Sequence, residues 1–358
     1  MGGSGFTCGP LEHGFCNQRR KMMVKVGVIG VGLQGQTHLR CYKALPNVEV
    51  VAISDVNPER LEEVGKQYSV PRMYTDHREM LKKESLDAVS VATPDHLHRD
   101  PVLACTEAKV NILCEKPLAT RIEDAEAMVK AAKDAGVKLM VNFSNRWMSY
   151  MAITKKAIED GELGEPLYAY ARLSNTIYVP TGMLKTWSSH TKLPFWLMSH
   201  TIDRVRWLFG GKAVKVYGVA RSKVLKNIGI DTPDFYAALV EFDNGAVGNF
   251  ESCWVLPDTR PSVVDSKMEL IFTRGSVSID AQQTMIQKAT ESSYTVPGTL
   301  FVDIYGTPVG FVMEAIRHFV ECVGEDREPW ASGEDGLEVV RTCAAIVRSA
   351  ETGRPVEL

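Results

Sequence analysis

The chain has 358 residues, 45% of them hydrophobic and 24% charged, which is ordinary for a globular protein long enough to form two packed domains. Its 41 basic and 44 acidic side chains leave a formal net charge of −3, which gives no reason to expect a nucleic-acid or membrane partner. No apolar run approaches the roughly 20 residues that span a bilayer. The eight cysteines include no CxxC pair, so we expect no metal site, no disulfide framework and a reducing, cytoplasmic compartment.

The first 22 residues are set apart by their composition. The stretch MGGSGFTCGPLEHGFCNQRRKM is rich in glycine and has no apolar central region, which distinguishes it from a secretory signal. The globular pattern starts at about Met23, so we expect residues 1–22 to be a disordered leader or tag. Cys8 and Cys16 lie in this leader without the paired ligands that a metal site would need.

From residue 24 to residue 143, short apolar runs alternate with helical patterns. The predicted strands are 24–30, 48–55, 86–93, 110–117 and 137–143. Helices are predicted between them, for example over 57–68, where Pro58 is near the start, and over 122–136, where Gly136 closes an amphipathic pattern. Because strands that alternate with helices indicate a doubly wound parallel sheet, residues 23–143 are predicted to form an α/β Rossmann domain.

A glycine-rich turn follows the first predicted strand and opens a helix. It consists of Gly30, Gly32, Leu33, Gln34 and Gly35, the GxGxxG spacing of dinucleotide-binding turns. The helix start offers unpaired N–H groups to a pyrophosphate. Asp55 ends the second strand, where a carboxylate accepts ribose hydroxyls and repels a 2′-phosphate. The pattern predicts NAD rather than NADP; the alternatives are a flavin, another nucleotide, S-adenosylmethionine or no ligand.

Polar side chains follow the third and fourth predicted strands. Thr93, Pro94 and His98 follow the third strand, and Glu115 and Lys116 follow the fourth. Because ligands of open parallel sheets bind at the carboxyl ends of the strands, all five are expected to line the cofactor crevice. The alternative for His98 is a helix-start residue bonded to a backbone carbonyl, and for Lys116 a solvated lysine. A lysine at a strand end, directly before a proline, favours a chemical role.

The segment LPFWLMSHTIDRVRWLFG, residues 193–210, predicts one helix with two covered faces. One face carries the apolar stripe Met198, Ile202, Val205 and Phe209. The other carries Trp196, His200, Asp203 and Trp207. Because a face turned to water seldom carries two tryptophans, the second face is expected to be covered as well, with Trp196 forming an apolar wall.

Residues 144–358 show a different pattern. A helix is predicted over 150–164, then a series of strands, and two terminal helices over 309–329 and 333–353. The sequence FDNGA, residues 242–246, predicts a hairpin with a type I′ turn, and Gly275 predicts another. We therefore expect an α+β domain with an open, mostly antiparallel sheet. Its terminal helices can pack back on the Rossmann domain. Since few helices are available to cover the sheet, a homo-oligomer, dimer or tetramer, is predicted.

Several residues of this second half are candidates for contact with a small-molecule substrate. The long segment 175–196 contains Lys185, Trp187 and His190, and loops of this length are often functional. The alternative is a surface or subunit-interface loop. Arg146, just past the last strand of the first domain, is a candidate for holding substrate or cofactor. His318 lies in the apolar pattern of a terminal helix and is interpreted as structural.

The motifs VIGVGLQGQTH, ATPDHLH, CEKPLA and the His-x-x-Asp helix resemble the glucose–fructose oxidoreductase / myo-inositol dehydrogenase / MocA family over residues 23 to 358. The resemblance implies a Rossmann domain followed by an open, mostly antiparallel sheet. It implies NAD(P)-dependent oxidation or reduction of a hydroxyl-bearing carbon in a sugar, cyclitol or related polyol. It also places the catalytic lysine at Lys116 and the catalytic histidine at His200, with a cis peptide between Lys116 and Pro117.

One position departs from the family pattern. The family commonly carries an aspartate four residues before the histidine, where this chain has Trp196. His200 then works with Lys116 alone, or Asp203 supports it by fixing its tautomer, or the activity differs. Arg204 or Arg206 is the alternative partner of Asp203, and a buried histidine satisfied by Asp203 is the alternative for His200.

The expected chemistry is proton handling beside a nicotinamide. Lys116 is expected to hydrogen-bond the reacting oxygen, its pKa lowered by partial burial, and His200 to relay the proton, since a histidine titrates near neutral pH. The alternative functions are a catalytically silent NAD-binding regulator or sensor, and a reductase of a non-sugar ligand such as a tetrapyrrole or an amino-sugar derivative.

Overall fold

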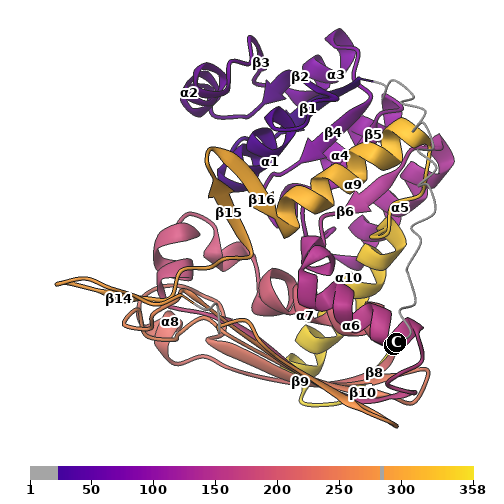
Figure 1. The fold of residues 1–358 in the computed structure, drawn as a ribbon, viewed down its shortest axis with the longest axis vertical. Helices are drawn as coiled ribbons and strands as arrows, with labels where there is room; N and C mark the ends of the chain where they lie inside the picture. Colours follow the sequence, from indigo (N-terminus) through magenta and orange to yellow (C-terminus); the bar gives the residue numbers. More distant parts are fainter. Residues whose placement is uncertain (1–22, 283–285) are drawn as a thin grey trace, which may run out of the picture.

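The computed structural model describes residues 23–282 and 286–358 (Figure 1). The predicted leader, residues 1–22, lies outside the described residues, and so do Cys8 and Cys16. Two large sheets dominate the fold: a six-stranded sheet built from the first part of the chain and a seven-stranded sheet built from the second. The boundary between residues 143 and 144 stays a prediction. None of the described helices is both long and apolar enough to cross a lipid bilayer.

The six-stranded sheet is parallel throughout, as predicted. Its strands are β1 (Val24–Ile29), β2 (Val48–Ser54), β3 (Arg72–Tyr74), β4 (Ala88–Val91), β5 (Asn111–Cys114) and β6 (Leu139–Val141), in the spatial order β3-β2-β1-β4-β5-β6. All four residues of β4 are buried, and three of them are apolar, as in a strand covered on both faces. The short edge strand β3 was not predicted, because its residues are exposed or half-buried and leave no apolar run.

Helices connect these strands. They are α1 (Leu33–Lys43), α2 (Pro58–Tyr68), α3 (His77–Lys83), α4 (Arg99–Glu107) and α5 (Ile122–Ala135), with a 3₁₀ turn η1 (Asp95–Leu97) after β4. The Asn57 side chain caps α2 by accepting a hydrogen bond from the Arg60 amide. Gly136 ends α5 in the left-handed conformation, with φ of 67°. The strand–helix alternation read from the sequence is therefore confirmed.

The seven-stranded sheet is mostly antiparallel, which confirms the second predicted architecture. Its strands are β7 (Pro166–Asn175), β8 (Ala213–Arg221), β9 (Phe235–Phe242), β10 (Val247–Cys253), β11 (Val264–Phe272), β12 (Ser276–Asp280) and β17 (Val356–Glu357). The spatial order is β12-β11-β7-β10-β9-β8-β17, and only the β7–β10 pair is parallel. Two small hairpins stand apart: β13 (Lys288–Ala289) with β14 (Tyr294–Thr295), and β15 (Phe301–Ile304) with β16 (Thr307–Gly310).

The turn between β9 and β10 differs from the expected type I′. That turn type requires positive φ at both central residues, whereas only Gly245 has a positive φ here, of 84°. The Gly245 amide donates to the Phe242 carbonyl, so the central residues are Asp243 and Asn244, and Gly245 follows them. The Asn244 side chain donates to the Phe209 carbonyl at 3.0 Å, which ties the hairpin to a helix end instead.

The remaining helices are α6 (Ser149–Glu159), α7 (Ser199–Phe209), α8 (Val224–Asn227), α9 (Phe311–Glu325) and α10 (Gly333–Thr352). Short turns are η2 (Ser144–Trp147), η3 (Val179–Met183), η4 (Ser188–His190) and η5 (Pro194–Met198). The helix predicted from residue 193 is divided, because the segment that starts at Pro194 is a π-helical turn and regular α-helix begins at Ser199. Its apolar stripe is buried as predicted.

Helix α10 joins the two sheets (Figure 1). Near its start, the Val141 amide of β6 donates to the Ala331 carbonyl at 2.9 Å, and the Ser332 side chain caps the helix. Near its end, the Ser349 hydroxyl accepts from the Gly218 amide of β8 at 2.8 Å. This helix therefore connects β6 of the first sheet with β8 of the second.

Candidate active site

The glycine turn after β1 has the geometry of a dinucleotide site. Gly30 has φ of 84°, and a Cβ atom there would lie 2.8 Å from the Ala92 carbonyl oxygen. A Cβ atom on Gly35 would lie 1.9 Å from the Gly30 oxygen, so only glycine fits either position. Around Gly32, by contrast, the space is open, which leaves room for a pyrophosphate at the start of α1. Leu33 and Gln34 are exposed on the first turn of this helix.

Asp55 lies directly after β2 and beside this turn. One carboxylate oxygen accepts from the Val31 amide at 2.9 Å, and the other accepts from the Asn57 amide at 2.9 Å. The Arg60 guanidinium lies 3.7 Å from the same carboxylate. A carboxylate has about four acceptor positions, so both oxygens keep capacity for ribose hydroxyls. The residues present therefore fit NAD.

Both ring nitrogens of His98 lie within hydrogen-bond distance of backbone carbonyl oxygens. Its Nδ1 lies 2.9 Å from the Pro117 oxygen, and its Nε2 lies 3.0 Å from the Thr93 oxygen. The imidazole is buried and ties the loop after β4, including Pro94, to the loop after β5. This geometry favours the alternative interpretation of His98, a residue bonded to backbone carbonyls.

Glu115 belongs to a buried polar cluster that the sequence did not reveal. His38 Nε2 lies 2.8 Å from Glu115 Oε1, and Asn142 Nδ2 donates to the same oxygen at 2.7 Å. His38 Nδ1 lies 2.9 Å from the Ser90 hydroxyl. Burial would raise the pKa of Glu115, but these hydrogen bonds and the His38 charge outweigh it and lower the pKa to about 2. Glu115 is therefore an ionised support within the fold. The sequence signal that could have identified His38 is its position three residues after Gly35, the last glycine of the motif.

Lys116 follows β5 and points at the segment before α7. Its Nζ donates to the Trp196 carbonyl at 3.0 Å and lies 4.1 Å from the centroid of the Trp196 ring. The peptide bond between Lys116 and Pro117 is cis, as the resemblance implied. Burial lowers the pKa of the Lys116 amine, while the charges of Glu115 and Asp95 oppose that shift.

His200 lies in the first turn of α7, within reach of the Lys116 charge. The burial of the ring, together with the charges of Lys116 and Arg204, holds the pKa of His200 well below 6.5. This differs from the expectation that His200 titrates near neutral pH. The Asn145 side-chain nitrogen lies 3.3 Å from His200 Nδ1. Since an amide nitrogen donates, Nδ1 accepts, and the neutral ring carries its proton on Nε2.

Asp203 and Arg146 form a buried ion pair with each other. Arg146 Nε donates to one oxygen of Asp203 at 3.0 Å, and Nη2 donates to the other at 2.5 Å. Both side chains are buried, and Arg146 also contacts Asp335 at the start of α10. Asp203 therefore fixes the packing of α7 rather than the His200 tautomer. The alternative that Asp203 pairs with Arg204 or Arg206 is also replaced, because the partner is Arg146.

An aromatic group extends from the Trp196 ring, which contacts the Lys116 amine. Trp187 and Trp196 meet edge to face, with centroids 5.3 Å apart. His96, from the loop after β4, stacks on His190 at 5.4 Å. Of the three residues expected to contact substrate from this segment, Trp187 and His190 thus lie in one aromatic group with Trp196. Lys185 is exposed.

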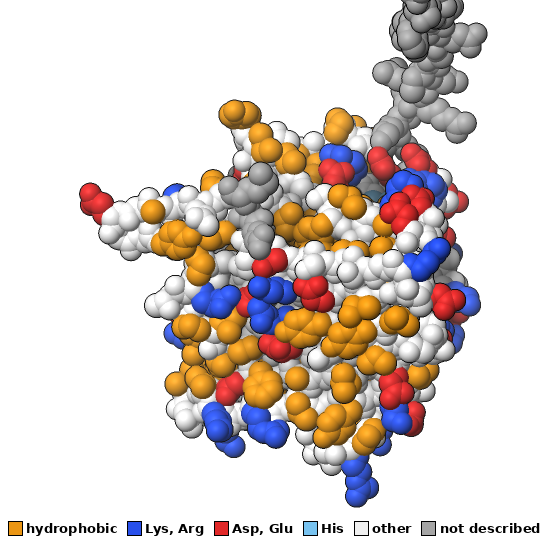
Figure 2. All heavy atoms as spheres, turned by 60° about the horizontal axis from the view of Figure 1, so that its bottom comes forward, with side chains coloured by type: hydrophobic (Ala, Val, Ile, Leu, Met, Phe, Trp, Pro, Cys, Tyr) orange, Lys and Arg blue, Asp and Glu red, His pale blue; other side chains and the backbone are white. Residues whose placement is uncertain are grey.

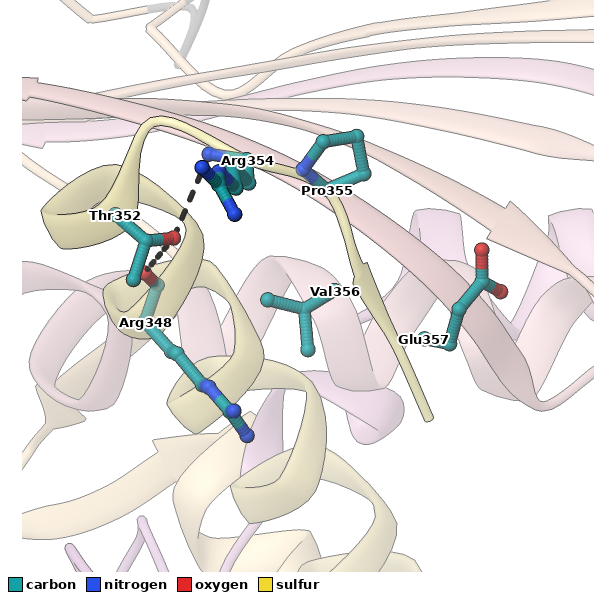
Figure 3. A pocket seen from close by; sticks show the side chains of 6 residues that line it. All are labelled: Arg348, Thr352, Arg354, Pro355, Val356 and Glu357. Atoms are coloured by element: carbon teal, nitrogen blue, oxygen red, sulfur yellow. Dashed lines mark hydrogen bonds between the residues drawn. The ribbon is translucent and has the colours of Figure 1, made fainter.

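A surface hollow lies elsewhere (Figure 3). It has a volume of about 570 Å³ and is lined by Arg348, Thr352, Arg354, Pro355, Val356 and Glu357. The Thr352 hydroxyl bonds the Arg348 carbonyl and accepts from the Arg354 amide, which ties the end of α10 to the last strand. None of the predicted site residues lines this hollow, so it carries no part of the site.

A parallel sheet whose glycine turn fits NAD defines an NAD-binding protein. Two family models match the chain: the NAD-binding Rossmann fold of the GFO/IDH/MocA oxidoreductase family over residues 24–143, and its C-terminal alpha/beta domain over residues 155–358. The chain belongs to this family, which confirms the resemblance read from its motifs.

Individual relatives are distant but match over nearly the whole chain. D-apiose dehydrogenase of Paraburkholderia graminis is 28% identical, over 93% of this chain and 89% of its own. scyllo-Inositol 2-dehydrogenase (NAD(+)) of Bacillus subtilis is 29% identical, over 94% of this chain and 96% of its own. The crystal structure of scyllo-inositol dehydrogenase from Lactobacillus casei with bound NAD(H) and scyllo-inositol has a TM-score of 0.81 at 18% identity, covering 94% and 99% of the two chains. That last likeness shows the fold.

Proposed function

We propose that this protein transfers a hydride between NAD and a carbinol or carbonyl carbon of a sugar, cyclitol or related polyol. The names of the relatives, an apiose dehydrogenase and inositol dehydrogenases, support this substrate class. The observation that carries the proposal is the contact of the Lys116 amine with η5, the turn directly before α7. The Lys116 amine binds the Trp196 carbonyl, one helical turn before His200, and its charge depresses the pKa of that imidazole.

The site residues would divide the work as follows. Bound NAD⁺ supplies the acceptor for the hydride. Gly30, Gly32 and Gly35 let the backbone approach its pyrophosphate, and Asp55 accepts its ribose hydroxyls. Lys116, with its lowered pKa, accepts the proton of the reacting hydroxyl. His200 donates a hydrogen bond from Nε2 to a substrate oxygen, because its Nδ1 is engaged by Asn145 and its ring stays neutral.

The aromatic group favours a polyol as the bound molecule. Trp187 and Trp196 present ring faces and edges on which the CH groups of a sugar or cyclitol can pack. His190 and His96 lie at the side of the same group and offer ring nitrogens to hydroxyls. A water-excluding wall of this kind also strengthens the polar contacts of Lys116.

Turnover of a substrate panel tests the proposal. Purified protein with NAD⁺ is given inositols, aldoses and sugar alcohols, and NADH formation is followed by absorbance; the reverse reaction uses NADH with keto-sugars. We expect turnover of at least one polyol by the wild type. Tight NAD binding without turnover of any member would instead indicate an NAD-binding regulator.

We also propose a cytoplasmic homo-oligomer that associates through the outer face of the seven-stranded sheet. Figure 2 shows hydrophobic side chains among charged ones on the lower face of the molecule. Tyr217, Leu239 and Ile271, from β8, β9 and β11, are 44%, 48% and 45% exposed. Sedimentation analysis should give a dimer or tetramer, and Leu239→Lys should shift it towards the monomer. A monomeric wild type would refute this.

A further inference from the structure

Arg204 is a buried cation that forms no ion pair with an acidic side chain among the residues that the structure describes. Only 1% of its surface is exposed, and its Nη2 has no hydrogen-bond partner within residues 23–282 and 286–358. Its Nε donates to the His200 carbonyl at 3.3 Å, and the Tyr150 hydroxyl is its other partner. Both partners are neutral. Because a buried charge is costly unless it is paired, this guanidinium needs an anion that the described chain does not provide.

The nearby carboxylates are already neutralised. Asp203 is held by both arms of Arg146, and Asp335 is contacted by Arg146 and by Arg206. These two carboxylates and two guanidiniums balance in charge. Arg204 therefore remains as one uncompensated positive charge within the helix pair α7 and α10.

The position of Arg204 connects it with the proposed active site. His200 and Arg204 are four residues apart on α7, so they lie in one row along this helix, and Trp196 lies in the π-helical turn directly before it. Helical side chains lean towards the N-terminus, which brings the Arg204 guanidinium back over the turn of His200. Its contact with the His200 carbonyl, and its effect on the pKa of His200, agree with this placement.

We infer that the substrate carries a carboxylate and that Arg204 binds it, so that the preferred substrate is an acidic sugar or another polyol acid. The guanidinium fork matches a carboxylate with two parallel hydrogen bonds. Trp196 fits the same substrate class, since an aspartate at that position would repel an anion bound along the row. This inference rests on the proposed dehydrogenase function and narrows its substrate.

Matched pairs of ligands test the inference. The probes are D-glucuronate against D-glucose, D-galacturonate against D-galactose, and D-gluconate against D-glucitol, each differing by one carboxylate. Binding to the protein saturated with NADH is measured by calorimetry and thermal shift, and turnover is measured with NAD⁺. We expect at least one acid to bind about tenfold or more tightly than its neutral partner. Equal binding within all three pairs, or no binding of any acid, would overturn the inference.

Variants separate a ligand-binding role from a structural one. Arg204→Met should raise the Kd of the preferred acid by about 10²-fold and leave that of the neutral partner nearly unchanged. It should also raise the Tm of the ligand-free protein, because it removes an unpaired buried charge. The matched control Arg206→Met, which breaks an ion pair with Asp335, should lower the Tm. A lower Tm for Arg204→Met with equal loss for acid and neutral ligands would show a merely structural arginine.

The outcomes also distinguish the inference from the proposed function. Binding of an acid that depends on Arg204, without any NADH formation, would support the anion site and reject the dehydrogenase. Turnover of neutral polyols without preference for their acids would support the dehydrogenase and reject the anion site.

Discussion

The Lys116 amine and Trp196 are joined by two contacts: a hydrogen bond of 3.0 Å to the backbone carbonyl and an approach of 4.1 Å to the ring centroid. The backbone carbonyl gives the amine a hydrogen-bond acceptor. The ring stabilises the ammonium form by about 1 kcal/mol through its π face. Trp196 thus departs from the family pattern but still gives the Lys116 amine a hydrogen-bond acceptor and a π face.

Replacing the Lys116 amine should remove the proton acceptor. For Lys116→Met we expect kcat to fall by about 10²-fold or more, because general-base catalysis contributes about 10² to 10⁴. The Kd of NADH, measured by fluorescence titration, should change little. The control Lys130→Met alters an exposed lysine paired with Asp134 and should keep full activity. Full activity of Lys116→Met would exclude this residue from the mechanism.

The pH dependence of polyol oxidation should follow Lys116. Since burial lowers the pKa of its amine from 10.5, the neutral, proton-accepting form appears at lower pH than for a free lysine. The rate should therefore rise with pH, with an apparent pKa below 10.5. Because the pKa of His200 lies well below 6.5, the profile should show no inflection near 6.5. A histidine-like inflection there, lost in His200→Asn, would contradict this assignment.

Asp55 should determine the choice between the two nicotinamide cofactors. Asp55→Ser removes the carboxylate that is placed for the ribose hydroxyls and also removes its repulsion of a 2′-phosphate. We expect the KM for NAD⁺ to rise about tenfold or more and the KM for NADP⁺ to fall, which steady-state kinetics with each cofactor can measure. An unchanged ratio of kcat/KM for the two cofactors would refute the ribose role.

Glu115 should make the fold sensitive to acid. Its pKa lies at about 2 in the folded chain against an ordinary 4.5, so its contribution is complete above pH 4.5 and is lost as the pH falls towards 2. A shift of this size corresponds to about 3 kcal/mol of unfolding free energy. Urea unfolding of Glu115→Gln should show its deficit relative to wild type shrinking between pH 5 and pH 3. A deficit that does not depend on pH would argue against the shifted pKa.

Asp203 should matter for stability rather than for chemistry. Asp203→Asn leaves Arg146 as a buried charge with a weakened partner, which should cost about 3 to 5 kcal/mol of unfolding free energy. The pH profile of kcat should keep its shape. Replacing both partners, as Arg146→Met with Asp203→Leu, should recover part of the stability. An altered pH profile at unchanged stability would return Asp203 to the tautomer-fixing role.

Local patterns accounted for the architecture and for the position of the cofactor site. Alternating apolar runs specified the parallel sheet, because buried strands need continuous apolar side chains, and glycine spacing specified the turn, because only glycine fits at Gly30 and Gly35. Lys116 and Asp55 were identified as candidate site residues because each stands at the end of a predicted strand. The edge strand β3 and the helix α3 were missed, since short elements on the surface leave weak patterns.

What the sequence by itself determined about this protein is therefore its sheets, its glycine turn and the residues at its strand ends. Only the tertiary structure decided which charged groups are paired. Asp203 binds Arg146, 57 positions away, rather than a neighbour on its own helix. Among the described residues, Arg204 forms no ion pair with an acidic side chain. Backbone sterics and apolar periodicity act within a few residues, so they can be read locally. The partner of a buried charge depends on which distant helices pack together, and no local spacing records that.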